Sequence, residues 1–312
     1  MKRKTLLPIL VSLTLIFIFI FSIKPRTSRI PSDAVGDSFL DAIKENYVSG
    51  GVEKDGIPSI DEPKYISAMQ AEAQGIVRPD SIVLGVERSG ETFAYPESIM
   101  YWHEVVNEKI GGEKLSITYC PLTESAIGYA GVHLGVSGKL YNSNLVLYDR
   151  KTQSTIPQIL GIAVDGLLKG RSLKQFPIQV TKWEAWRRKH PETKVLSRDT
   201  GYARNYDKQP YPGYDQLLRL WFPVAAKNNS FHTKEIVYGI SRNYKNLAVI
   251  DSKFGNESTK VKLGNETIEI SRDKELGTIK ARVGNDAIPA IRMYWFAWYA
   301  YHPDTLVLSS DQ

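Results

Sequence analysis

Apolar and polar residues alternate along much of this chain in short runs, the pattern of β-strands with one buried face. The runs lie at residues 82–86, 92–95, 115–119, 126–129, 132–136, 145–148, 236–240, 247–250, 260–263, 267–270 and 279–283. Gly, Asn and Asp residues separate them, and Gly264-Asn265 forms a two-residue hairpin turn between two of the runs. The pattern predicts a sheet-rich domain in which successive strands form meanders.

Helical spacing is confined to a few short segments. Apolar residues three and four apart predict a short helix within residues 31–53, and Pro96 predicts the start of a helix that runs to about residue 107. Residues 183–189 predict a further helix, and residues 197–215 a long loop. No internal repeat is evident. The fold class we expect is therefore mixed α+β, dominated by sheet, with a few short helices.

Residues 6–23 form a nearly uninterrupted apolar run that follows Lys2-Arg3-Lys4. Such a run spans about 27 Å as a helix, close to the hydrocarbon thickness of a bilayer. No cleavage site of the small-x-small kind follows it. We therefore expect residues 1–30 to be an uncleaved signal anchor, with a cytoplasmic N-terminus and the membrane as partner of residues 6–23.

The rest of the chain is then expected to lie outside the cytoplasm. Residues 31–53 would form a juxtamembrane helix and linker, and residues 54–307 a globular α+β domain. This length can bury one large core or two fused lobes, at about 54–230 and 231–307.

The formal net charge of +6 suggests nucleic-acid binding until the charges are located along the chain. Six of the 40 basic residues lie in residues 1–30, which contain no acidic residue, so the remainder carries 34 basic and 34 acidic residues. A neutral domain lacks the basic surface that phosphate binding requires. We expect no nucleic-acid partner.

The candidate reactive residues are Cys120, His103 and Glu104. Cys120 is the only cysteine, so the chain forms no intramolecular disulfide. A thiolate at this strand end suits a nucleophile with His103 as its base and Glu104 beside it. The alternative is an inert thiol, because free cysteine is among the most buried residue types.

Soft ligands suit a copper or zinc ion, so Cys120, His103 and His133 are also the candidate metal ligands. Asn107 stands where a zinc-protease helix carries its second histidine, which argues against that class of enzyme. Small, turn and charged residues nearby give the candidate ligand-binding residues, which are Ser137, Asn142, Asp149 and Arg150.

Motifs spread over the domain carry a family resemblance. They include Lys54-Asp55-Gly56-Ile57-Pro58, Ala94-Tyr95-Pro96, His103-Glu104, Thr118-Tyr119-Cys120-Pro121-Leu122, Gly135-Val136-Ser137-Gly138, Tyr148-Asp149-Arg150, Arg198-Asp199-Thr200-Gly201, Pro210-Tyr211, Gly213-Tyr214-Asp215 and His302-Pro303-Asp304-Thr305. On these motifs the chain resembles the uncharacterised domain-of-unknown-function family 3179 over about residues 54–307. The resemblance implies a shared domain and a shared site but no reaction.

One departure from the family pattern concerns the cysteine. The family often shows Cys-Pro-Leu-Cys where this chain has Cys120-Pro121-Leu122-Thr123. The resemblance therefore implies that this chain lacks the second thiol of a redox or metal-binding pair.

These observations predict a membrane-anchored extracytoplasmic domain that binds a small ligand or a soft metal, copper or zinc, near Cys120 and His103. A cysteine-dependent enzyme with Cys120 as nucleophile and His103 as base is the second hypothesis. The third is a surface-structural or partner-binding module whose motifs only maintain the fold.

Overall fold

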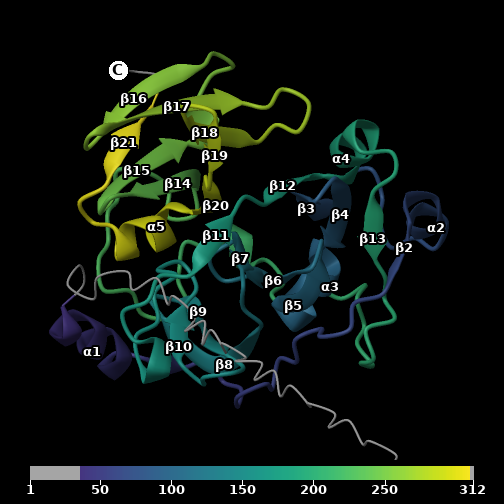
Figure 1. Ribbon diagram of the computed structural model, residues 1–312, viewed down its shortest axis with the longest axis horizontal. Coiled ribbons are helices and arrows are strands. Elements are labelled where there is room, and N and C mark those ends of the chain that lie inside the picture. Colours follow the sequence, from purple (N-terminus) through teal and green to yellow (C-terminus); the bar gives the residue numbers. More distant parts are fainter. Residues whose placement is uncertain (1–35, 310–312) are drawn as a thin grey trace, which may run out of the picture. The chain divides into compact units, whose positions relative to one another are not determined.

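The fold is taken from a computed structural model, which describes residues 36–309 (Figure 1). The predicted signal anchor, with its apolar run at residues 6–23, lies outside these residues. Between residues 36 and 309, no helix is long and apolar enough to cross a membrane.

Short helices punctuate a chain that consists mostly of strands and loops. The α-helices of residues 36–309 are α1 (Asp37–Glu45), α2 (Ala68–Ala73), α3 (Glu97–His103), α4 (Trp183–Lys189) and α5 (Trp295–Tyr301). Single 3-10 turns occur at η2 (Gly166–Leu168), η3 (Tyr214–Gln216) and η4 (Asp251–Lys253). The predicted sheet-dominated domain with few short helices is confirmed.

The strands form small sheets, and neighbours in each sheet are named in spatial order. The first is β1 (Val48–Ser49), β8 (Leu134–Tyr141), β9 (Asn144–Asp149) and β10 (Thr155–Pro157); the second is β11 (Lys174–Phe176), β7 (Ser125–Ala130), β6 (Glu113–Cys120) and β5 (Val105–Ile110). The third is β12 (Gln179–Lys182), β3 (Ile82–Arg88), β4 (Glu91–Pro96), β13 (Lys194–Leu196) and β2 (Tyr65–Ser67). The fourth is β20 (Ile291–Tyr294), β14 (Ile236–Arg242), β15 (Lys245–Ile250) and β21 (Leu306–Leu308); the fifth is β16 (Thr259–Leu263), β17 (Glu266–Arg272), β18 (Ile279–Val283) and β19 (Asp286–Ile288).

The helix predicted after Pro96 is shorter than expected. It ends at His103 because Glu104 adopts a left-handed conformation with φ 57°. The following residues, which the prediction gave to the helix, form β5 and pair with β6 across the turn at Gly111-Gly112. The β-branched pair Val105-Val106 suits a strand better than a helix.

The expectation of a chain without an internal repeat is wrong, because one strand arrangement occurs twice. The order β12-β3-β4-β13 in the third sheet recurs as β20-β14-β15-β21 in the fourth. The registers agree as well. Val83 pairs with Pro96, and Val237 pairs with Ile250, so each hairpin joins the second residue of its first strand to the last residue of its second strand.

The adjoining meander is duplicated in the same way. The order β5-β6-β7-β11 matches β16-β17-β18-β19, and the first turn closes with Ile110 opposite Glu113 in one copy and Leu263 opposite Glu266 in the other. In the first copy a long insertion separates β7 from β11, and it contains most of the β8-β9-β10 sheet. The second copy passes directly from β18 to β19.

Each copy contains a buried tryptophan that makes the same contacts. Trp186 on α4 donates a hydrogen bond from Nε1 to Thr193 Oγ1 at 3.0 Å, and Trp298 on α5 donates one to Thr305 Oγ1 at 2.8 Å. Each indole packs on the histidine four residues later, with ring centroids 4.1 and 4.2 Å apart. The motif His302-Pro303-Asp304-Thr305 is therefore part of a structural contact that the first copy repeats.

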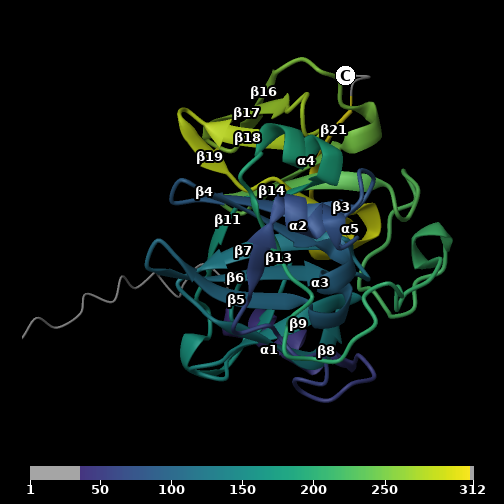
Figure 2. The same cartoon turned by 90° about the vertical axis from the view of Figure 1, so that its right-hand side faces the viewer.

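The tryptophans also cover a glycine in the adjacent strand. Gly85 on β3 lies beneath the ring of Trp186, and Gly239 on β14 lies beneath the ring of Trp298. Figure 2 shows α4 beside β3, as this contact requires. A Cβ at either glycine would lie well inside van der Waals contact with the indole.

We expect Gly85→Ala and Gly239→Ala to destabilise the protein to a similar degree. Overpacking a well-packed core typically costs about 1–3 kcal/mol, and a rigid indole leaves little room to adjust. Urea unfolding measures the loss. Gly255→Ala is the control, because a Cβ there has open space and the backbone is not left-handed. Equal stability of all three variants would contradict the duplicated contact.

Candidate functional site

Cys120 ends β6 and is 1% exposed. Burial, reinforced by the charge of Glu104, raises the pKa of the thiol to about 11. The hydroxyl of Thr123, the residue in place of the family's second cysteine, is also buried and lies 2.8 Å from Ser125 Oγ. The environment therefore favours a protonated thiol in the free protein.

His103 is held by groups other than Cys120. Its Nδ1 lies 2.8 Å from the carbonyl oxygen of Pro58, and its Nε2 lies 2.7 Å from Tyr206 Oη. Because a carbonyl only accepts, Nδ1 carries the proton and Nε2 accepts from the tyrosine. Burial also lowers the pKa of His103. These contacts tie the 197–215 loop to the segment before β2.

The candidate metal ligands do not assemble into a metal site. His133 Nε2 lies 3.2 Å from the carbonyl oxygen of Glu108, and both ring nitrogens of His103 are engaged by Pro58 and Tyr206. Among residues 36–309, no group of three or more His, Cys, Asp or Glu side chains is placed to hold a metal ion.

Three of the four candidate ligand-binding residues hold turns. Ser137 donates to the carbonyl oxygen of Val146, and Asn142 donates to that of Ala300 at 3.1 Å. Asp149 accepts from the backbone and the hydroxyl of Thr152, at 2.8 and 2.7 Å. Ser137 and Asp149 therefore stabilise the β8-β9-β10 sheet, whereas Asn142 ties the β8-β9 turn to α5.

Arg150 brings together two motifs that lie far apart in the sequence. Its guanidinium lies 3.2 Å from Asp61 Oδ2 and 3.9 Å from Asp55 Oδ1, and it donates to Ser59 Oγ. Tyr148 Oη donates to Asp55 Oδ2 at 2.7 Å. The result is a half-exposed ion-pair cluster, and such clusters contribute little to stability.

Glu104 occupies the most unusual environment of the predicted residues. Its carboxyl group is buried in a left-handed backbone position, and burial raises its pKa to about 8. The charge of Glu104 helps to raise the pKa of Cys120 and the pKa of Tyr211. The charge of Cys120 in turn helps to raise the pKa of Tyr214. Tyr214 is 2% exposed, and its Oη has no hydrogen-bond partner within the described part of the chain.

These residues lie next to a polar cavity of about 250 Å³, which we call the tyrosine cleft. Its lining comes from the first copy, from the second copy and from residues 197–235 between them, which we call the connecting segment. The lining residues are Ile82, Glu97, Tyr101, Pro121, Glu124, Gln209, Tyr211, Tyr214, Asp215, Arg292 and Tyr294. The cleft therefore lies where the two copies meet, a common position for ligand sites.

A carboxyl pair forms one wall of the cleft. Tyr119 Oη lies 2.8 Å from Glu97 Oε1 and 3.0 Å from Glu124 Oε2, and Arg292 donates to Glu124 Oε1 at 2.6 Å. Burial and the charge of Glu124 raise the pKa of Glu97 to about 7. The phenol of Tyr119 is the donor toward both carboxyl groups, and its single proton serves one of them at a time.

Most of this cleft was not predicted. Tyr211, Tyr214 and Pro121 fall within the motifs of the family resemblance, which is a signal that sequence reasoning left unused. Glu97 and Arg292 carry no local signal, because carboxylates and arginines are common and only the fold brings these two together.

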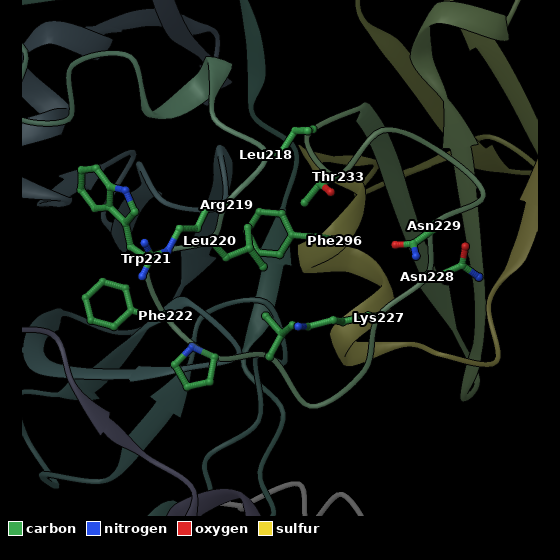
Figure 3. Close-up of a pocket in the computed structure, with 12 residues that line it drawn as sticks. Leu218, Arg219, Leu220, Trp221, Phe222, Lys227, Asn228, Asn229, Thr233 and Phe296 are labelled. Atoms are coloured by element: carbon green, nitrogen blue, oxygen red, sulfur yellow. The ribbon is translucent and has the colours of Figure 1, made fainter.

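A second, larger cavity of about 500 Å³ adjoins the connecting segment, as Figure 3 shows. Phe296 on α5 lines it together with Leu218, Leu220 and other residues of the segment. Its lining contains no carboxylate. Trp221, which also lines it, packs edge-on against Tyr214 with ring centroids 4.7 Å apart. The larger cavity thus neighbours the tyrosine cleft.

Fold and site together define a sheet-dominated domain with a duplicated core and a polar cleft between the copies. The chain belongs to the family described as a protein of unknown function, DUF3179, whose model matches residues 54–285. The resemblance found in the sequence is thereby confirmed. Neither the curated proteins nor the solved structures contain a match.

The buried carboxyl of Glu104 makes stability pH-dependent. Between its ordinary pKa of 4.5 and its raised pKa of about 8, the folded protein keeps a proton that the unfolded chain has released. Rising pH therefore favours unfolding across this window, by at most about 1.4 kcal/mol per pH unit. We expect the stability of the wild type to fall relative to Glu104→Gln from pH 5 to pH 8.

Urea unfolding at several pH values measures this difference. Glu62→Gln, at an exposed position, is the control and should follow the wild type. Parallel pH curves for the wild type and Glu104→Gln would show that Glu104 ionises normally.

We expect Cys120 to react slowly with iodoacetamide at neutral pH, because the thiol is buried and its pKa is about 11. In urea it should react like a free thiol. Mass spectrometry over time measures both rates, and Ser258→Cys in a Cys120→Ser background supplies an exposed reference. Rapid native labelling with a transition near neutral pH would restore the nucleophile hypothesis.

Proposed function

We propose that this domain binds a small, hydroxyl-rich ligand of about one sugar ring in the tyrosine cleft. The cleft is slightly smaller than the pockets of about 300–1,000 Å³ that hold drug-sized ligands. With the predicted anchor at residues 6–23, the ligand would be met outside the cytoplasm.

The observation that carries the proposal is the unpartnered hydroxyl of Tyr214. A buried polar group without a partner costs about 1–3 kcal/mol, so such groups are usually satisfied by another molecule. Tyr214 lines the cleft, is 2% exposed, and its Oη lacks a partner among the described residues. A ligand hydroxyl would supply one.

The rest of the lining suits the same chemistry. Glu124 and Asp215 present carboxylate oxygens that accept hydrogen bonds from hydroxyls, whereas Arg292 and Gln209 present donors. Aromatic side chains add apolar surface with a polar tip, which matches the alternating C–H and O–H groups of a sugar.

The interpretation of Cys120 as a nucleophile with His103 as its base finds less support. Both nitrogens of His103 are engaged by Pro58 and Tyr206, and burial raises the pKa of the thiol. We assign Cys120 and Glu104 instead to the buried floor behind the cleft.

Tyr214→Phe tests the proposal, because it removes only the unpartnered oxygen. We expect unchanged or slightly higher stability, since a buried unsatisfied group is lost, and about tenfold weaker ligand binding. Ligand-observed NMR of the full-length chain with methyl glycosides of common monosaccharides measures binding.

Tyr244→Phe is the matched control, because Tyr244 is 67% exposed on the β14-β15 turn. It should bind like the wild type. If no glycoside binds to the wild type, or if Tyr214→Phe binds as tightly as the control, the proposed function fails.

A further inference from the structure

The larger cavity has walls of a different chemistry from those of the tyrosine cleft. Its volume is about 500 Å³, and most of the side chains that line it are apolar, among them Leu220, Phe222 and Phe296. Figure 3 shows Trp221 and Phe222 on one side of Phe296, and Lys227 and two asparagines on the other. Small-molecule pockets typically measure about 300–1,000 Å³. The cavity is therefore large enough for a ligand of its own.

The apolar floor of the larger cavity occurs in the second copy alone. Phe296 is 6% exposed and stacks on Tyr294, with ring centroids 6.1 Å apart. The first copy has the exposed Glu184 at the matching position, since both residues stand two places before the tryptophan of the duplicated contact. The duplicated fold accepts a charged, exposed residue here and does not itself require the aromatic ring of Phe296.

Hydrogen bonds from outside the connecting segment fix the wall of the cavity. The backbone N–H of Ala225 donates to Asn142 Oδ1 at 2.8 Å, and Trp295 Nε1 donates to the carbonyl oxygen of Asn228 at 3.0 Å. Asn142, which the sequence suggested as a ligand-binding residue, is thus a positioning residue for this wall. Because the wall is already ordered, a ligand would bind without the cost of ordering it.

The rim of the cavity exposes apolar side chains to water. Leu218 is 66% exposed, and Trp221 is 45% exposed. Exposed apolar side chains that lie together commonly mark a ligand-binding groove. An apolar chain that covered them would remove this surface from water, which is favourable in proportion to the area covered.

The charged side chains of the lining are both basic. They are Arg219 and Lys227, and neither makes an ion pair or a side-chain hydrogen bond within residues 36–309. The lining contains no carboxylate, although residues 31–312 as a whole carry no net charge. Guanidinium and ammonium groups pair with carboxylate and phosphate oxygens. An anionic head group therefore complements this lining, and a cationic one does not.

We propose that the larger cavity binds a single-chain amphiphile with an anionic head group. The apolar chain lies against Phe296, Leu218 and Trp221, and the carboxylate or phosphate of the head group meets Arg219 and Lys227. This site is separate from the tyrosine cleft, and it does not depend on the function proposed for that cleft.

The test uses native mass spectrometry of the full-length chain in a nonionic detergent. The two probes have the same apolar chain and opposite charge, dodecyl phosphate and dodecyltrimethylammonium. We expect a single dodecyl phosphate to bind per chain and the cation to bind about tenfold more weakly, because its charge faces two basic side chains. Dodecanoate then shows whether a carboxylate head group is accepted as well.

Removal of the basic side chains tests the recognition of the head group. Arg219→Gln combined with Lys227→Gln should weaken the binding of dodecyl phosphate about tenfold and abolish the preference over the cation. Arg171→Gln combined with Lys151→Gln is the matched control, because it removes the same charge at exposed positions outside the cavity. The control should bind like the wild type.

Leu218→Glu tests the apolar rim. The exposed position tolerates a polar side chain, so the melting temperature should stay unchanged, whereas the new carboxylate repels the anionic head group and should weaken binding about tenfold. Leu167→Glu is the matched control, because Leu167 is 85% exposed on η2 and does not line the cavity.

Absence of dodecyl phosphate binding by the wild type overturns the inference, and so does equal binding of the two probes. Binding of dodecyl phosphate that stays unchanged in Leu218→Glu or in the variant without the two basic side chains also overturns it. None of the probes contains a sugar ring, so these results leave the test of the tyrosine cleft independent.

Discussion

The structure depends on a tryptophan that packs flat against a glycine of the neighbouring strand, once in each copy. Trp186 covers Gly85 and Trp298 covers Gly239, and each indole then donates a hydrogen bond to a threonine. Each tryptophan thus connects its helix to a hairpin and to the start of the strand that pairs in parallel with the second strand of that hairpin, β13 with β4 and β21 with β15. Burial of a large aromatic side chain contributes on the order of 3 kcal/mol, so this contact fixes the position of the strands around it.

The two copies are joined at the wall of the cleft. Arg292 of β20 reaches Glu124 at 2.6 Å, and the backbone N–H of Tyr294 donates to the carbonyl oxygen of Thr123 at 2.9 Å. Loss of either charge would leave the other partly buried and uncompensated, which is strongly unfavourable. The same ion pair therefore holds the copies together at the wall of the cleft.

Alternation of apolar and polar residues located most strands, because each strand has a buried face. The helix after Pro96 was predicted too long, since nothing in the sequence reveals the left-handed backbone of Glu104. The repeat escaped notice because the inserted segment changes the spacing between matching strands. The signal was present, since Trp183-Glu184-Ala185-Trp186 and Val195-Leu196-Ser197 match Trp295-Phe296-Ala297-Trp298 and Val307-Leu308-Ser309. Rare residue types led to Cys120 and His103, and Glu104 was predicted as the neighbour of His103. Glu97 and Arg292 meet only through contacts that are distant in sequence.

Comparison of the copies separates residues that maintain the fold from residues that differ for another reason. His190 and His302 occur in both copies and pack on the tryptophans, so they belong to the fold. Cys120, by contrast, occupies the position of Asp273, which Lys189 and Lys280 hold at 2.6 and 2.7 Å. In the first copy a thiol stands at this position and is influenced by the buried carboxyl of Glu104, and both groups stay largely protonated near neutral pH. The floor behind the cleft is therefore buried and largely uncharged near neutral pH, whereas the matching position of the second copy carries a network of charges.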